Sequence, residues 1–194
     1  ENHYLSRKSG FRKKEPYILG LSGSAKVRYK GHEELLRAIA RVRDSLPAFR
    51  IEMIGPGDTT WIKKLAISLN LEEHLILKGK LRAGKEVTNW LESLDIYVHP
   101  SKQEGLPRSV IEAMSKGLPV LASSVAGIPE LIESKYLHKP GDYTTLGKQL
   151  ISVLLDPSIR KDMSQTNFSV SKKYDSSILE SQRQAFWKRF ASTI

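Results

Sequence analysis

The sequence of 194 residues contains no cysteine. Disulfide bonds and thiolate chemistry are therefore excluded, and the absence fits a reducing, cytoplasmic compartment. No apolar run approaches the roughly 18 residues that a membrane-spanning helix requires, and no signal peptide is visible. Hydrophobic residues make up 40% of the chain and charged residues 27%. These proportions are ordinary for a globular domain with a sizeable core.

Several catalytic signatures are missing as well. The Gly-x-Ser-x-Gly turn of serine hydrolases does not occur, and the glycines around Lys30 lack the order of a phosphate-binding P-loop. Gly55-Pro56-Gly57 resembles part of a dinucleotide fingerprint, but the third glycine is absent and a proline interrupts the pattern. The five histidines are scattered without close acidic partners. We therefore expect neither a metal ion nor a bound cofactor.

Basic residues exceed acidic ones, 31 against 21, which gives a net charge of +10. This charge attracts phosphate groups, nucleic acid or an anionic membrane surface, and by itself it cannot decide among them. The basic residues are spread along the chain, as on a solvated surface. Because no basic stripe carries stacking aromatics, we do not expect nucleic-acid binding. Association with the cytoplasmic face of a membrane stays open.

Apolar periodicity predicts alternating strands and helices. Such alternation is typical of an α/β fold, here a Rossmann-like doubly wound parallel sheet with helices on both faces and extra C-terminal helices. Strands are expected at 17–21, 51–54, 75–77, 96–98, 119–122 and 136–138. Helices are expected at 35–46, 62–69, 86–94, from Ser109, briefly after Pro129, at 146–154, and from Pro157 to the end.

This pattern predicts one main domain. Residues 1–15 are polar and are expected to form a linker or loosely held segment, residues 16–175 the Rossmann-like domain, and residues 176–194 a C-terminal helix. The chain begins with Glu1 rather than methionine. We therefore expect a piece of a longer protein.

The segment from 96 to 122 carries the most information. Pro100 ends a short β-branched and aromatic strand, and loop chemistry follows to Pro107. Ser109-Val-Ile-Glu112 reads as a capping box that opens a helix, and Gly117 suits the left-handed residue after its end. Such a loop, which leaves a parallel strand and enters a helix, is the usual ligand-binding position of an open α/β sheet. Its spacing can direct Glu104 and Glu112 into one cleft.

These residues resemble the sugar-nucleotide motif of the retaining glycosyltransferases of family 4, a glutamate, seven residues and a second glutamate. The similarity runs from Lys30-Gly31 to Pro140-Gly141-Asp142. It implies the carboxyl-terminal, donor-binding half of a two-domain GT-B hexosyltransferase. The implied donor is a UDP- or GDP-linked sugar, and the implied acceptor is a saccharide or a lipid-linked molecule. Without its N-terminal acceptor domain, we expect the chain to be inactive.

For the two glutamates, the resemblance must be weighed against ordinary structural roles. Glu104 can be a solvated loop acid, whereas the family's matching residue touches the transferred sugar. Glu112 can simply complete its capping box, whereas the family's matching residue binds the ribose hydroxyls. We favour the family's roles for both.

Phosphate binding is predicted at the entrance to the same helix. The free amides there and the helix dipole favour an anion, and Gly105, Leu106, Arg108 and Ser109 surround them. Lys30 resembles the family's phosphate-contacting lysine, whose charge offsets the departing diphosphate.

The sequence departs from the family pattern at Ser24, where the family has an arginine. Lys26 or Arg28 is expected to substitute for it, and Gly79 matches the position where the backbone meets the nucleotide base. The departure leaves an alternative open, a noncatalytic nucleotide-binding or regulatory module of the same fold.

Overall fold

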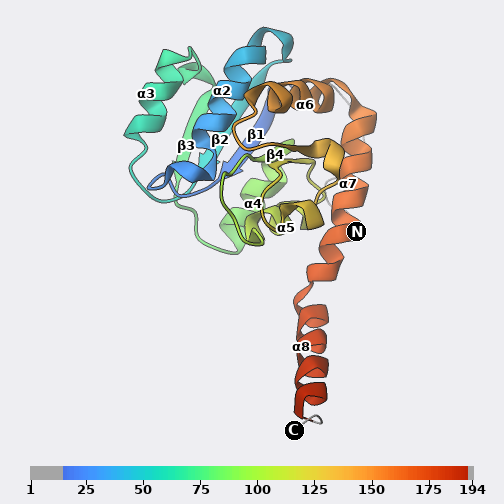
Figure 1. Cartoon of the computed structure of the whole chain (residues 1–194). Helices are drawn as coiled ribbons and strands as arrows, with labels where there is room; N and C mark the ends of the chain where they lie inside the picture. Colours follow the sequence, from blue (N-terminus) through green and yellow to red (C-terminus); the bar gives the residue numbers. More distant parts are fainter. Residues whose placement is uncertain (1–14, 192–194) are drawn as a thin grey trace.

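The computed structural model describes residues 15–191 and shows a parallel sheet of six strands. Helices pack on both of its faces (Figure 1), as the alternating pattern predicted. The strands are β1 (Tyr17–Ser22), β2 (Phe49–Ile54), β3 (Leu75–Gly79), β4 (Ile96–His99), β5 (Val120–Ser123) and β6 (Leu137–His138). The main helices are α2 (His32–Val42), α3 (Thr60–Ser68), α4 (Lys85–Ser93), α5 (Arg108–Ser115), α6 (Tyr143–Leu155), α7 (Pro157–Ser171) and α8 (Ser176–Ala191).

The strand order is β3-β2-β1-β4-β5-β6, and every pairing is parallel. The chain therefore builds outward from β1 in one direction and then returns to add β4 on the other side. A gap between diverging loops forms at such a reversal, outside the carboxyl ends of the two strands. The β1 and β4 loops meet at this point.

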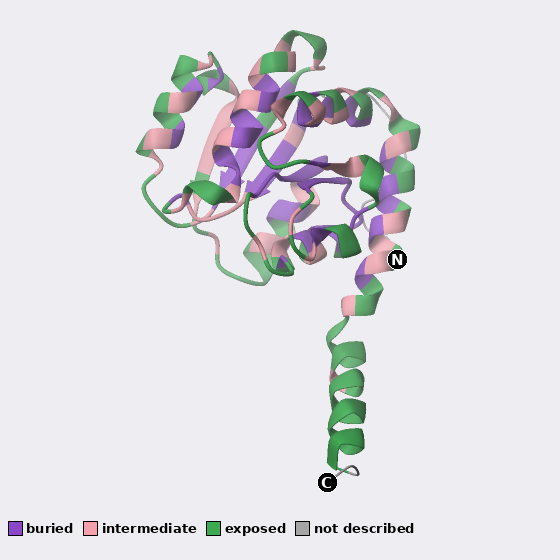
Figure 2. Ribbon diagram, in the orientation of Figure 1, coloured by how far each residue is buried: buried purple, intermediate pink, exposed green. Residues whose placement is uncertain are grey.

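Alternation along the strands divides the apolar core between the two faces. Leu19 and Val98 face a cluster shared with α2, α3 and α6, while Tyr97 and Val120 face a cluster shared with α4 and α5. β4 and β5 are buried along their whole length, as expected for central strands covered on both sides. Figure 2 shows the purple, buried strands between the helices. This double burial holds the loops at the strand ends on a rigid base.

The helix ends agree with several sequence expectations. Gly117 adopts φ 68° after α5, and Asn70 adopts φ 54° after α3; both are left-handed positions that end helices. Residues 128–130 form only a single 3₁₀ turn, one of six such turns in the described part of the chain.

Two expectations about helices were wrong. The chain is not helical without a break from Pro157 to its end, because a 3₁₀ turn at Lys172–Tyr174 and extended Asp175 separate α7 from α8. Asp175 accepts a hydrogen bond from the amide of Ser177 and starts a new helix. α5 begins at Arg108 instead of Ser109, because Pro107 occupies the N-cap position.

α8 extends away from the sheet and is exposed along its length (Figures 1 and 2). Its large apolar side chains, among them Phe186, Trp187 and Phe190, stay accessible. The predicted linker, residues 1–15, lies outside the described residues except for Glu15.

Candidate functional site

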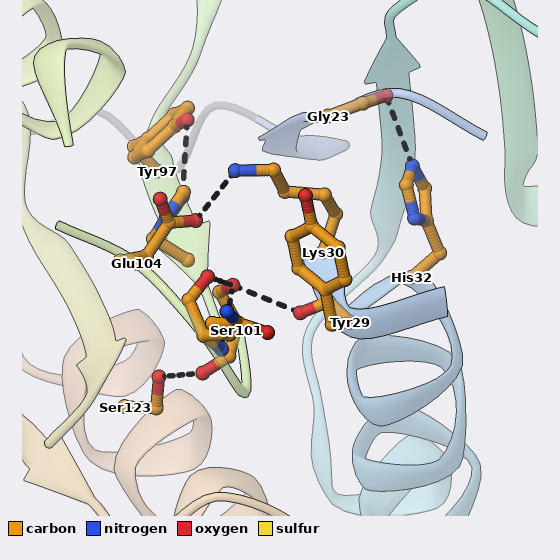
Figure 3. A network of polar contacts seen from close by, with 10 residues as sticks. Gly23, Tyr29, Lys30, His32, Tyr97, Ser101, Glu104 and Ser123 are labelled. Atoms are coloured by element: carbon orange, nitrogen blue, oxygen red, sulfur yellow. Dashed lines mark hydrogen bonds and ion pairs between the residues drawn. The ribbon is translucent and has the colours of Figure 1, made fainter. Parts of the chain in front are cut away.

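The candidate site lies where the loop after β1 meets the loop after β4. The backbone amide of Lys102 and the hydroxyl of Ser101 both donate to the carbonyl oxygen of Tyr29, each at 2.8 Å. Gly31 adopts φ 87°, and a Cβ there would come within 2.5 Å of the carbonyl oxygen of Pro100. The two loops are therefore in direct backbone contact (Figure 3), and only glycine permits this approach at residue 31.

Glu104 is the centre of the polar contacts in these loops. The Nζ atom of Lys30 and the Nε2 atom of His99 each lie 2.9 Å from its Oε1 atom, and its side chain is only 8% exposed. Burial by itself raises the pKa of Glu104, but the hydrogen bonds from His99 and Lys30 outweigh burial and lower the pKa to about 2. Glu104 is therefore a charged, almost enclosed carboxylate, and the interpretation of it as a solvated loop acid is wrong.

Glu112 has a different environment. It lies in the middle of α5 on an exposed position, and it lines a hollow of about 290 Å³ between α4 and α5 together with Gly84, Val87 and Lys116. The capping box does not form, because Pro107 is the N-cap residue and no side chain caps the helix. The interpretation of Glu112 as a capping residue is therefore wrong, which leaves its carboxylate available to solvent or a ligand.

Tyr97 connects the surroundings of the two acids. Burial raises the pKa of Tyr97 far above its usual value, and the charges of Glu104 and Glu112 both add to this effect. Both carboxylates are thus close enough to the same buried phenol to act on it electrostatically. Ser109, which the sequence assigned to the helix cap, acts in the opposite direction and favours a lower pKa of Tyr97.

The amino end of α5 opens beside these groups. Leu106 and Arg108 are exposed. The first backbone hydrogen bond of the helix runs from the amide of Val110 to the carbonyl oxygen of Pro107, at 3.1 Å. The carbonyl oxygen of Gly105 accepts from the amide of Gly127 at 3.1 Å, which joins this loop to the segment after β5. A helix end of this kind has unpaired amides and a partial positive charge.

Lys26 and Arg28, the other basic residues of the β1 loop predicted at the site, have different surroundings from Lys30. The guanidinium of Arg28 lies 3.7 Å from the centre of the Trp61 ring, a cation–π contact. Lys26 is exposed, and its amide is bonded to the hydroxyl of Ser24 at 3.3 Å. Lys30 does not open α2, since it belongs to a 3₁₀ turn at Arg28–Lys30. Of the three cations, Lys30 is the one joined to Glu104.

Gly79 ends β3 with φ 68°, and its carbonyl oxygen accepts from the amide of Gly55 at 2.8 Å. No atom lies within 4 Å of the position that a Cβ would occupy. The backbone at this position is therefore uncovered on that side.

Three further residues lie beside the site, His99, Glu34 and Lys102. His99 is buried and bonded to Glu104. Glu34, whose side chain is 2% exposed, lies 2.6 Å from the Nζ atom of Lys102 and ties α2 to the loop that carries Glu104. The sequence signal for His99 is its position at the end of a strand. Its partner, Glu104, lies in the loop that follows.

Within residues 15–191, no group of three or more histidine, aspartate or glutamate side chains is placed to hold a metal ion. Within the same residues, no helix has the length and apolar character needed to cross a bilayer.

Comparison with known proteins identifies the family of the chain. The profile of the glycosyl transferases group 1 family matches residues 4–169. Protein CapJ of Staphylococcus aureus is 33% identical over 144 residues, which cover 74% of this chain and 37% of CapJ. The sulfoquinovosyl transferase SQD2 of Arabidopsis thaliana is 33% identical over 151 residues, covering 75% of this chain and 29% of the relative. The chain thus spans less than half the length of these curated relatives.

Solved structures show the same fold at lower identity. The C-terminal domain of a group 1 glycosyl transferase, LpcC of Francisella tularensis, superposes with a TM-score of 0.74 at 22% identity, over 90% of this chain and 93% of that domain. HepE of Anabaena, in complex with UDP and glucose, gives a TM-score of 0.78 at 19% identity, over 99% of this chain and 52% of HepE. The fold is therefore that of one domain of a GT-B enzyme. By its sequence match over most of its length, the chain belongs to the group 1 glycosyl transferases.

Proposed function

We propose that the chain is the donor-binding half of a hexosyltransferase that moves a sugar, with retention, from a UDP- or GDP-linked donor to a saccharide or lipid-linked acceptor. The observation that carries this proposal is the ion pair of Lys30 and Glu104 at the point where the strand order reverses, beside the amino end of α5. Relatives named as a sulfoquinovosyl transferase and as an N-acetyl-alpha-D-glucosaminyl L-malate synthase support it, as does a structural neighbour in complex with UDP and glucose.

Each group has a role that its surroundings suit. Glu104 is ionised at neutral pH and accepts hydrogen bonds, so it can orient hydroxyl groups of the transferred sugar. Lys30 carries a positive charge next to the amino end of α5, where both can stabilise the negative charge of the departing diphosphate. Gly105, Leu106, Arg108 and Ser109 frame that end. No residue of this chain is assigned as a base.

Nucleotide recognition is assigned to the exposed side of α5. Glu112, free of any capping role, binds the ribose hydroxyls, and the uncovered backbone at Gly79 meets the base. Glu112→Ala should then weaken UDP binding by about 10-fold or more, because a hydrogen bond to a charged group contributes about 1.5–3 kcal/mol. Glu73→Ala, at an exposed acid on the 3₁₀ turn before β3, is the matched control and should change nothing.

Isothermal titration calorimetry with UDP, GDP, ADP and the corresponding sugar nucleotides tests the proposal. We expect binding of one uracil or guanine diphosphate, strengthened or kept when the sugar is present. Absence of binding by all of them at millimolar concentration would refute the proposal. Because the acceptor half is outside this chain, we expect weak donor binding and little or no turnover by the chain alone.

A noncatalytic nucleotide-binding or regulatory module is the second candidate. Ser24 favours it, because this residue replaces the family's arginine and its hydroxyl is committed to the carbonyl oxygen of Pro56 at 3.2 Å. Arg28, the expected substitute, rests on Trp61. The longer protein that contains both halves separates the candidates: a transferase consumes its sugar nucleotide when acceptor is supplied, whereas a module binds the nucleotide and leaves it intact.

A further inference from the structure

The side chains of Tyr97 and His99 form a chain of hydrogen bonds that ends on Glu104. They are two residues apart on β4, so they project to the same face of the sheet. Their rings are nearly parallel, with an angle of 16° and centroids 6.0 Å apart. The Tyr97 hydroxyl lies 3.5 Å from Nδ1 of His99, and Nε2 of His99 lies 2.9 Å from Oε1 of Glu104. Figure 3 shows Tyr97, Glu104 and Lys30 converging from separate elements.

The direction of this chain follows from what each group can donate. An ionised carboxylate only accepts, so the Nε2 atom of His99 must carry the hydrogen that reaches Glu104. In a neutral ring Nδ1 then carries no hydrogen and can only accept, so the Tyr97 hydroxyl, 3.5 Å away, is the donor. A neutral His99 with its hydrogen on Nε2 satisfies both ends.

The surroundings make this arrangement rigid. The side chain of His99 is 2% exposed and Tyr97 is fully buried. The Glu104 carboxylate, in contrast, belongs to an exposed glycine-containing loop that would otherwise allow several rotamers. His99 thus supplies a fixed donor from the sheet to an acid on a loop.

We propose that His99, held in its Nε2–H tautomer by Tyr97, is a positioning residue that fixes the Glu104 carboxylate in the orientation that also meets Lys30. The role of Glu104 toward the sugar rests on the proposed function, whereas the position of the carboxylate does not.

Two variants with similar shapes separate positioning from packing. His99→Gln keeps an amide donor near the place of Nε2, while His99→Met has a similar length without a donor. Folding of both is checked by circular dichroism and thermal melting. The carbon resonance of the Glu104 carboxyl group is then followed by NMR from pH 7 to pH 4. We expect no titration in the wild-type chain and in His99→Gln, and a clear upward shift of the titration in His99→Met, because this variant loses one of the two hydrogen-bond donors that oppose the effect of burial on the pKa of Glu104.

The tautomer is read directly from nitrogen-15 spectra of the His99 ring, which distinguish the two neutral forms and the cation. The Nε2–H form is expected at pH 7. An Nδ1–H form, or identical titrations of the Gln and Met variants, would overturn the proposal.

Donor binding gives the functional readout. The gain in affinity of the best sugar nucleotide over the bare diphosphate should survive in His99→Gln and fall at least 5-fold in His99→Met. If the wild-type chain bound no nucleotide, the proposed function would fail, and the tautomer and titration would still decide the positioning role.

Discussion

The contact between Gly31 and Pro100 gives a sharp test of how the two site loops are joined. Gly31→Ala places a methyl group 2.5 Å from the carbonyl oxygen and 2.6 Å from the carbonyl carbon of Pro100. Both are backbone atoms of the β4 loop, so no side chain can rotate away. Either the two loops move apart, or the folded protein keeps the steric overlap and loses stability. Lys30 lies next to Gly31 in the loop after β1, and Glu104 lies in the loop after β4.

The expected loss of folding stability in Gly31→Ala has two parts. An alanine with φ near 87° has a left-handed backbone, which costs about 1–2 kcal/mol. Forcing an extra methyl group into a packed site costs about 1–3 kcal/mol more. The control is Gly141→Ala, since Gly141 has φ 78° and no atom within 4 Å of its Cβ position. That control should lose only the backbone part.

Urea unfolding of the two variants and the wild-type chain, followed by circular dichroism, measures both values. We expect a loss of about 1–2 kcal/mol for Gly141→Ala and of about 2–5 kcal/mol for Gly31→Ala. Affinity for the donor nucleotide should fall in Gly31→Ala alone. Equal losses of stability in the two variants would refute the close approach of the loops.

Three further predictions concern charge, acid stability and the C-terminal helix. Lys30→Met should weaken diphosphate binding by about 10–100-fold, because a charge-assisted hydrogen bond is lost; calorimetry checks this, and the exposed Lys161→Met should have no effect. Burial lowers the pKa of His138 to about 4, so its neutral form stabilises the fold above pH 6.5, and this stability, about 1–3 kcal/mol, is lost as the pH falls toward 4. His138→Leu should therefore flatten the stability curve between pH 6.5 and 4 in urea unfolding, and an unchanged slope would contradict this. Because α8 has no buried residues, truncation after Asp175 should leave the melting temperature within about 2 °C, and a larger fall would show that the helix supports the domain.

Stability in acid also depends on Glu104 in a predictable direction. Its pKa is lowered in the folded chain to about 2, so its contribution is present above the ordinary carboxyl pKa and disappears as the pH falls toward 2. The histidine effect thus lies at higher pH than the glutamate effect, and the two can be separated in one titration.

The local features of the fold could be predicted from the sequence. β4, the loop to Pro107, α5 and the turn at Gly117 are set by neighbouring residues: a β-branched run, a proline that fixes φ, helical spacing of apolar residues and a glycine with φ 68°. The alternation of such units predicted the parallel sheet. The sequence also placed Glu104 in the loop and Glu112 on the helix that follows it, as the structure has them.

The immediate partners of these residues were decided only by the tertiary structure. Lys30 and Glu104 are 74 residues apart, and they meet because β4 pairs with β1 across the point where the strand order reverses. The capping box at Ser109 does not form, because Pro107 occupies the N-cap position and α5 begins at Arg108. Sequence spacing determines which face of an element a side chain occupies, but the choice among competing hydrogen-bond partners depends on which strands the sheet makes neighbours.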